Sequence, residues 1–324
     1  MSMPAAVESE ASAPPRIRVG FIVGPTGAGK TALALEVAQR LGAEIVNADS
    51  RQFYRAMDLG TAKPTPAERA RVAHHLIDIR APDAPLDVAA FVALAQAAIA
   101  QIAARDRRVL VVGGSGLYVR ALRGGIFRGP AASAEIRARL AQEAAEHGLE
   151  HLHARLSEVD TEAAARIGHN DLYRITRALE VFELTGEPIS AHQARHAFSA
   201  REYESLTVGI SPEREKLYHA IDRRFDAMIA AGFVAEVREL LAAGYAPGRP
   251  PLATIGYRQI ARHLAGELSL ADSVALAKRE SRRLAKRQLT WFRADRELIW
   301  LDPARPTEHA LGLFAEFFAR RQPA

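Results

Sequence analysis

Residues 24–31 read GPTGAGKT and fit the pattern G-x-x-x-x-G-K-[S/T]. Glycines in such a loop let backbone N–H groups point inward at an anion, and a helix that begins near Lys30 adds the positive end of its dipole. Lys30 brings a cation to terminal phosphates, and the Thr31 hydroxyl can bind Mg²⁺. An apolar run precedes the motif and an amphipathic segment follows it. The pattern therefore predicts a diphosphate-binding loop of Gly24, Pro25, Thr26, Gly27, Ala28, Gly29, Lys30 and Thr31.

A second feature distinguishes this loop from that of ordinary nucleotide hydrolases. Those proteins carry another strand that ends in an acidic residue. The best candidate here, RVLVVGGSGLY, ends in glycines around Ser115. The glycines allow close approach to a ligand, and Ser115 supplies a neutral hydrogen-bond donor. This arrangement argues against ATP hydrolysis and permits binding of a diphosphate that is itself the leaving group.

Asp49 follows the apolar segment EIVNA and opens the run DSRQ. Ligands of open parallel sheets bind beyond the carboxyl ends of the strands, so we expect Asp49 and Ser115 beside the phosphate loop. A carboxylate there can hold Mg²⁺ through water or take a proton from a nucleophile. The alternative is that Asp49 caps a following helix. Lys63, in DLGTAKP, is a candidate for a second phosphate contact, with a solvated surface lysine as the alternative.

The pattern of apolar segments predicts how these loops are held. Short apolar strands alternate with helical segments up to Arg128, which is typical of a parallel α/β sheet. From Ser133 to His196 the chain is rich in Ala, Glu and Arg and has helical periodicity, and strand character returns with LTVGI and ELIWLD. We expect a disordered tail (1–15) and a P-loop NTPase-like core (16–127 and 204–324) with flanking and C-terminal basic helices, interrupted by an all-helical insertion (128–203).

Composition limits the classes of protein further. The 324 residues carry a formal net charge of +5, which favours a polyanionic partner, and contain no cysteine, which excludes disulfides and cysteine-ligated zinc. The first residues lack the apolar core of a signal peptide, and no uninterrupted apolar run of about eighteen residues exists. We expect a soluble cytoplasmic protein that makes no contact with a membrane.

Eight motifs in order resemble one family: GPTGAGKT, ADSRQFY, GTAKP, HHLIDI, VGGSGLY, RALEVFELTG, TIGYRQ and KRQLTWFR, from about Val19 to about Asp302. They are similar to those of bacterial-type tRNA dimethylallyltransferases, also called tRNA isopentenyltransferases or the IPP transferase family. Members transfer a dimethylallyl group from dimethylallyl diphosphate to N6 of the adenine 3′ to the anticodon, in tRNAs that read codons beginning with U. The resemblance implies Mg²⁺ as cofactor, the anticodon stem-loop of tRNA as partner, and action as a monomer.

The resemblance also implies roles for individual residues. Asp49 matches the family's general base, Ser115 a residue that holds the departing diphosphate, and Arg258 an arginine of phosphate and transition-state contacts. Gln52 is a candidate reader of the adenine edge, and Tyr173 stands where the family has Gln. The implied tRNA-contacting residues are Asp49, Ser50, Arg51 and Gln52; Tyr173, Arg174, Ile175, Thr176 and Arg177; Gly256, Tyr257 and Arg258; and Lys286, Arg287, Gln288, Trp291 and Arg293.

Three other functions fit part of the sequence. A P-loop kinase of a small metabolite would explain the phosphate loop and Asp49, but not the basic insertion. An adenylate isopentenyltransferase acting on AMP or ATP would share the loop and the base, yet a mononucleotide needs no extended basic surface. An RNA-binding protein with a vestigial loop would not need Lys30, Thr31, Asp49 and Ser115 intact.

Overall fold

The computed structural model describes residues 16–125, 129–196, 202–249 and 252–320. Contacts divide the chain into two units: a sheet unit, Met1–Arg123 with Glu202–Ala324, and a helical unit, Gly124–Arg201. The sequence pattern predicts these divisions at residues 127/128 and 203/204. The expected tail of residues 1–15 lies outside the described residues.

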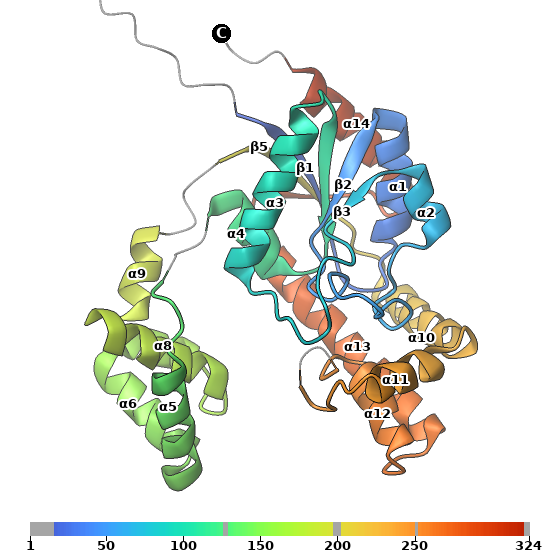
Figure 1. Ribbon diagram of the computed structural model, residues 1–324. Helices are drawn as coiled ribbons and strands as arrows, with labels where there is room; N and C mark the ends of the chain where they lie inside the picture. The colour runs from blue at the N-terminus through green and yellow to red at the C-terminus, as the bar shows by residue number, and fades with distance from the viewer. Residues whose placement is uncertain (1–15, 126–128, 197–201, 250–251, 321–324) are drawn as a thin grey trace, which may run out of the picture. The chain divides into compact units, whose positions relative to one another are not determined.

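A six-stranded parallel sheet lies at the centre of the sheet unit (Figure 1). Its strand order is β3-β2-β4-β1-β5-β6, and the predicted α/β fold class is confirmed. The winding changes direction between the neighbouring strands β1 and β4, which is where such sheets bind ligands. The strands are β1 (Arg18–Val23), β2 (Ala43–Asn47), β3 (His74–His75), β4 (Arg108–Gly113), β5 (Glu204–Gly209) and β6 (Leu298–Trp300).

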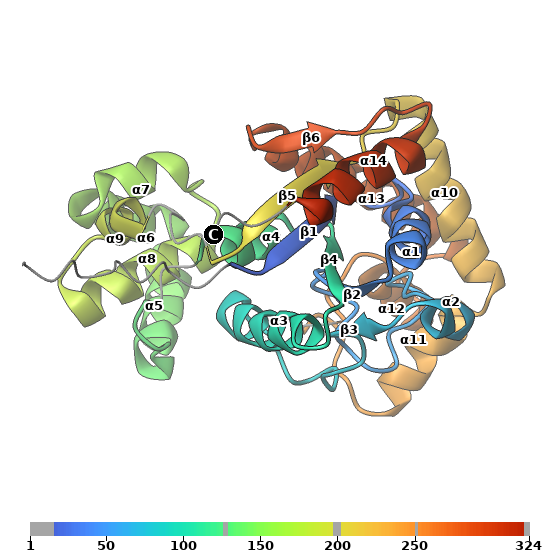
Figure 2. The same ribbon diagram turned by 90° about the horizontal axis from the view of Figure 1, so that it is seen from above.

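Helices cover both faces of this sheet, which is why its central strands are apolar on both sides (Figure 2). Helices α1 (Lys30–Leu41) and α14 (Pro306–Ala319) pack together on one face, while α3 (Val88–Ala103) packs on β2 and β4. Phe314 of α14 is fully buried against β1. A Cβ atom at Gly20 would lie 2.6 Å from its ring, so the middle of β1 accepts no larger residue there. The short helix α2 (Pro66–Arg71) contacts α1, and α4 (Gly116–Gly124) follows β4.

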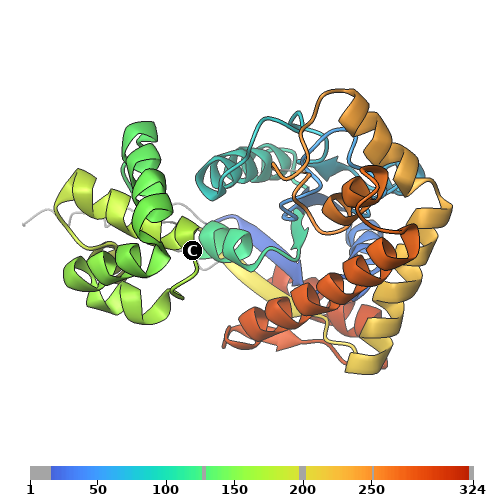
Figure 3. The same cartoon turned by 90° about the horizontal axis from the view of Figure 1, so that it is seen from below.

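A second helical layer lies at the carboxyl ends of the strands (Figures 1 and 3). It consists of α10 (Arg214–Ala230), α11 (Phe233–Ala242), α12 (Tyr257–Leu264) and α13 (Leu270–Arg293). Its own core includes an edge-on contact between the rings of Phe233 and Tyr257, whose centroids are 4.9 Å apart. This layer brings residues from the last third of the chain to the edge of the sheet where the phosphate loop lies.

The helical unit has a separate core. It contains α5 (Ala134–His147), α6 (Leu149–Val159), α7 (Thr161–Arg166), α8 (Leu172–Thr185) and α9 (Ile189–His196). Leu140, Leu152, Leu156 and Leu179 pack together inside it. Over the described ranges of the whole chain, no helix is long and apolar enough to cross a membrane.

Candidate functional site

The phosphate loop connects β1 to α1. Gly27 and Gly29 have φ angles of +81° and +86°, in the left-handed region that glycine adopts without strain. Gly29 is the N-cap of α1 and supplies no side chain to cap it, so backbone N–H groups at the start of the helix remain available to an anion. Ile221 of α10 and Ala285 of α13 pack with Ala28 and support the loop from outside.

Lys30 is enclosed within this loop. Its Nζ donates to the carbonyl of Pro25 at 2.8 Å. Burial lowers the pKa of Lys30 to about 8; the Asp49 carboxylate opposes this change and the Arg224 guanidinium adds to it. The lysine is therefore a buried cation with an incomplete set of anionic partners, as expected of a group that receives phosphate.

Asp49, Ser115 and the phosphate loop follow three neighbouring strands, β2, β4 and β1. The N–H of Ser50 donates to Ser115 Oγ at 3.1 Å, which joins two of these loops directly. Asp49 Oδ1 accepts from the N–H of Arg51 at 2.9 Å, and the Asp49 N–H donates to Asn47 Oδ1 at 3.0 Å. No helix begins after Asp49 until Pro66, so the alternative that Asp49 is a helix cap is wrong. The charge of this carboxylate acts on Lys30, so the two groups lie near each other.

Arg224 of α10 is a site residue that the sequence reasoning missed. Its Nη2 donates to Thr26 Oγ1 at 2.6 Å, while its Nε is buried without a hydrogen-bond partner among the described residues. Burial lowers the pKa of Arg224, and the charge of Asp49 opposes that change. A signal was present: Arg224 stands between Ile221 and Met228 on the buried face of an amphipathic helix, where an arginine needs an anionic or polar partner.

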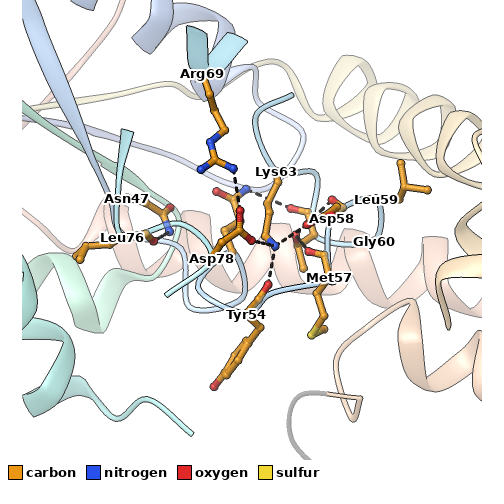
Figure 4. A network of polar contacts seen from close by, with 12 residues as sticks. Asn47, Tyr54, Met57, Asp58, Leu59, Gly60, Lys63, Arg69, Leu76 and Asp78 are labelled. Carbon is orange, nitrogen blue, oxygen red and sulfur yellow. Dashed lines mark hydrogen bonds and ion pairs between the residues drawn. The ribbon is translucent and has the colours of Figure 1, made fainter. Parts of the chain in front are cut away.

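The prediction that Lys63 contacts a phosphate needs correction (Figure 4). Its Nζ donates to the Tyr54 carbonyl at 2.5 Å and forms ion pairs with Asp58 at 2.6 Å and Asp78 at 2.5 Å. The side chain is only 4% exposed, and its three N–H donors are all used. The solvated-lysine alternative is wrong as well. Lys63 fixes the loop that follows Asp49.

The carboxylate of Glu236 on α11 holds the same loop from the other side. It accepts from the backbone N–H groups of residues 58, 59 and 60 and from the hydroxyl of Tyr257 at 2.5 Å. Tyr257 is fully buried, and burial followed by the Glu236 charge raises its pKa. The prediction that Tyr257 contacts tRNA is therefore corrected: this side chain anchors the loop. The Gly256 N–H likewise has an internal acceptor, Gln259 Oε1 at 2.7 Å.

Arg258 and Gln52 are held by neighbours within the sheet unit. Arg258 is 46% exposed, and its Nη2 donates to Glu280 Oε2 at 2.6 Å. Gln52 Nε2 donates to the carbonyls of Thr61 and Ala62 at 3.2 and 3.1 Å. Since both its donors are used, Gln52 can present only its oxygen to a ligand. The assigned roles of these two side chains stay predictions.

The residues predicted to contact tRNA on α8 divide into two groups. Ile175 is fully buried in the core of the helical unit, so its assignment is corrected. Tyr173 and Arg174 are exposed, with Tyr173 75% accessible. Arg177 is oriented by the buried Glu180 at 2.6 Å and by the Pro130 carbonyl at 3.1 Å, while Thr176 is half-buried. One face of α8 therefore carries the accessible groups.

The residues predicted to contact tRNA on α13 also form an exposed group and an internally bonded group. Lys286, Arg287 and Arg293 are exposed, and within the described residues they have no anionic partner. Trp291 is 43% exposed and packs against Gly116. Gln288 uses both ends of its carboxamide inside the protein, which corrects its assignment as a tRNA contact.

The strand order, the loop after β1 and the site at its carboxyl edge define a P-loop α/β transferase. The IPP transferase model matches residues 52–295. A tRNA dimethylallyltransferase of Geobacter metallireducens is 52% identical to this chain over 287 residues, which are 89% of this chain and 93% of that protein. The chain belongs to the IPP transferase family, and the resemblance stated from its motifs is confirmed.

Solved structures agree with this assignment. The tRNA isopentenylpyrophosphate transferase of Bacillus halodurans is 37% identical and superposes with a TM-score of 0.68, over 93% of this chain and 96% of that one. A eukaryotic dimethylallyltransferase acting on tRNA is 22% identical and has a TM-score of 0.82, over 94% of this chain and 80% of that one. The second comparison shows a shared fold.

Replacing Lys63 by Met should destabilise the protein by about 2–4 kcal/mol, because Asp58 and Asp78 would lose their buried cation. Lys63 and Arg69 outweigh the burial of Asp78 and hold its pKa below the ordinary 3.8. The stabilisation is therefore complete above about pH 4 and is lost as the pH falls through the folded-state pKa. Denaturant unfolding at pH 7 and pH 3 measures both effects. Arg69→Met, which removes the more exposed partner of Asp78, should cost less than about 1 kcal/mol, and equal losses would contradict the assignment.

The lowered pKa of Lys30 predicts how binding of inorganic diphosphate depends on pH. Below pH 8 the lysine is charged before binding; above pH 8 the anion must first draw a proton onto it. Relative to Lys30→Arg, which keeps its charge, the affinity of the unaltered protein should be constant below pH 8 and fall by up to about tenfold per pH unit above it. Calorimetric titration measures the affinity of both proteins at each pH. Since the ionisation of diphosphate affects both equally, it cancels in their ratio. Parallel pH profiles would show that Lys30 does not titrate there.

Proposed function

We propose that this chain transfers a dimethylallyl group from dimethylallyl diphosphate to N6 of the adenosine 3′ to the anticodon, in tRNAs that read codons beginning with U. It does so as a cytoplasmic monomer. The observation that carries the proposal is the placement of Lys30 and Asp49 at one edge of the sheet, after strands β1 and β2 on either side of β4, where the Asp49 charge acts on the Lys30 ammonium. A leaving diphosphate and a proton acceptor for the nucleophile are thereby brought together.

The reaction follows from these positions. The N6 lone pair of the adenine forms a bond to C1 of the prenyl group, while the C1–O bond breaks and its electron pair leaves with the diphosphate. Asp49 accepts the proton released from N6. Lys30, Arg224 and the Ser115 hydroxyl stabilise the negative charge that develops on the leaving group. Arg258 assists at the same phosphates if it exchanges its partner Glu280 for the ligand.

Mg²⁺ fits the donors that this site offers. The described residues contain no cluster of three or more His, Cys, Asp or Glu side chains, so a fully protein-ligated metal is not available there. Mg²⁺ commonly takes one or two protein oxygens together with phosphate oxygens and water. The Thr31 hydroxyl at the start of α1, with Asp49 through water, would hold the ion, which supplies charge neutralisation for the diphosphate.

Each of the two units carries exposed cations that can bind RNA. On α8 the accessible groups include Tyr173 and Arg174, and on α13 they include Lys286 and Arg287. Arginines and lysines bind phosphates, and an exposed aromatic ring stacks on an unpaired base. The target base must leave its stack to reach Asp49, as in other enzymes that modify a base.

Label transfer from radioactive dimethylallyl diphosphate with Mg²⁺ tests the function directly. Unmodified tRNA and AMP are offered in parallel. We expect label on the tRNA adenosine beside the anticodon. Label on AMP alone would assign the protein to the adenylate isopentenyltransferases. Label on neither, with turnover of ATP, would favour the small-metabolite kinase.

Asp49→Asn should lower kcat for prenyl transfer by about 100-fold or more, because an amide cannot accept the N6 proton. The affinity for unmodified tRNA, measured by filter binding, should change by less than about threefold. Asp83→Asn, an exposed aspartate outside the site, is the matched control and should behave as the unaltered protein does. Undiminished turnover in Asp49→Asn would remove Asp49 from the mechanism.

A further inference from the structure

Gln288 of α13 connects the two loops that face each other across the phosphate site. Its Oε1 accepts from the backbone N–H of Thr26, in the phosphate loop, at 2.8 Å. Its Nε2 donates to the carbonyl of Gly114, in the loop before Ser115, at 2.9 Å. One partner can only donate and the other can only accept, so the orientation of the carboxamide is determined. The three chain segments are 88 or more residues apart in sequence.

The glycines after β4 make room for this helix. A Cβ atom at Gly114 would lie 2.6 Å from Gln288 Nε2 and 3.3 Å from the Gly24 carbonyl. At Gly116 it would lie 2.1 Å from the Trp291 ring, one turn further along α13. We expected these glycines to allow the loop to approach a ligand. Gly114 and Gly116 instead allow α13 to pack directly on the loop that carries Ser115.

Thr26 is held by two helices that follow it in the chain. Gln288 accepts a hydrogen bond from the Thr26 backbone N–H, and Arg224 of α10 donates to the Thr26 hydroxyl at 2.6 Å. The first turn of the phosphate loop is thus attached to α13 at one atom and to α10 at another. Since Gly114 directly precedes Ser115, the same carboxamide also fixes the other side of the site.

We propose that Gln288 is a positioning residue for the diphosphate: it sets the separation between the phosphate loop and Ser115. The inference deepens the proposed function and rests on it. A side chain whose donor and acceptor are both used between these loops acts on the leaving-group site. Its neighbours Lys286 and Arg287 are exposed instead.

The test compares Gln288→Met with the unaltered protein. Methionine has similar length and makes neither hydrogen bond. We expect affinity for inorganic diphosphate with Mg²⁺, measured by calorimetry, to fall about tenfold through loss of the two bonds. The KM for dimethylallyl diphosphate should rise by a similar factor with little change in kcat, and the Kd for unmodified tRNA should stay within about twofold. Thr290→Ala, an exposed position on the same helix, is the control and should alter neither affinity.

A second variant separates geometry from the chemistry of the side chain. Gly114→Ala keeps Gln288 but displaces it, so it should weaken diphosphate binding as Gln288→Met does, in protein whose cooperative melting is intact. Unchanged diphosphate affinity in Gln288→Met, or weakened tRNA binding with normal diphosphate affinity, would overturn the inference.

Diphosphate affinity is measured separately from prenyl transfer, which tests the proposed function. If the unaltered protein bound diphosphate yet prenylated no tRNA, the proposed function would fail while the role of Gln288 stayed measurable. Failure to bind diphosphate at all would overturn both.

Discussion

Two partly buried cations, Lys30 and Arg224, lie within electrostatic range of one carboxylate, Asp49. Burial disfavours the charged form of each cation, and a single aspartate offsets only part of that penalty. The Nε of Arg224 is buried without a partner among the described residues. The site thus has excess positive charge and an unused donor, both of which a diphosphate anion would satisfy. The surrounding structure is arranged to keep these groups in place without that anion.

The parallel sheet alone could not hold all of these groups in place. Its strand order brings the loops after β2, β4 and β1 together, which accounts for Asp49, Ser115 and the phosphate loop. Arg224 and Gln288, however, come from α10 and α13, more than 190 residues beyond Thr26. The site is complete only when the C-terminal helices dock against the edge of the sheet. Diphosphate affinity should therefore be sensitive to substitutions that loosen this docking.

Local patterns were sufficient for the phosphate loop and for five of the six strands, but did not predict the short strand β3. The phosphate loop, the apolar strands and the helical insertion each follow from residue spacing over about ten positions, and the site edge follows from parallel topology. A motif does not state which way each of its side chains points. Tyr257 and Gln288 lie within motifs, and Ile175 lies two residues before one, yet their partners lie elsewhere in the chain. Their orientation depends on tertiary packing, which sequence spacing does not encode.

The contrast between Lys30 and Lys63 shows what does separate a ligand-binding lysine from a structural one. Both are largely buried, and each follows a glycine, Lys30 directly and Lys63 by three residues. Lys63 contacts two carboxylates and a carbonyl, so its charge is compensated and its donors are used. Lys30 donates to one carbonyl and forms no ion pair with Asp49, whose charge acts on it from a greater distance. Burial lowers the pKa of Lys30, and the charge of Asp49 offsets only part of that effect. A phosphate group would restore the balance at Lys30, whereas at Lys63 it would have to displace two aspartates.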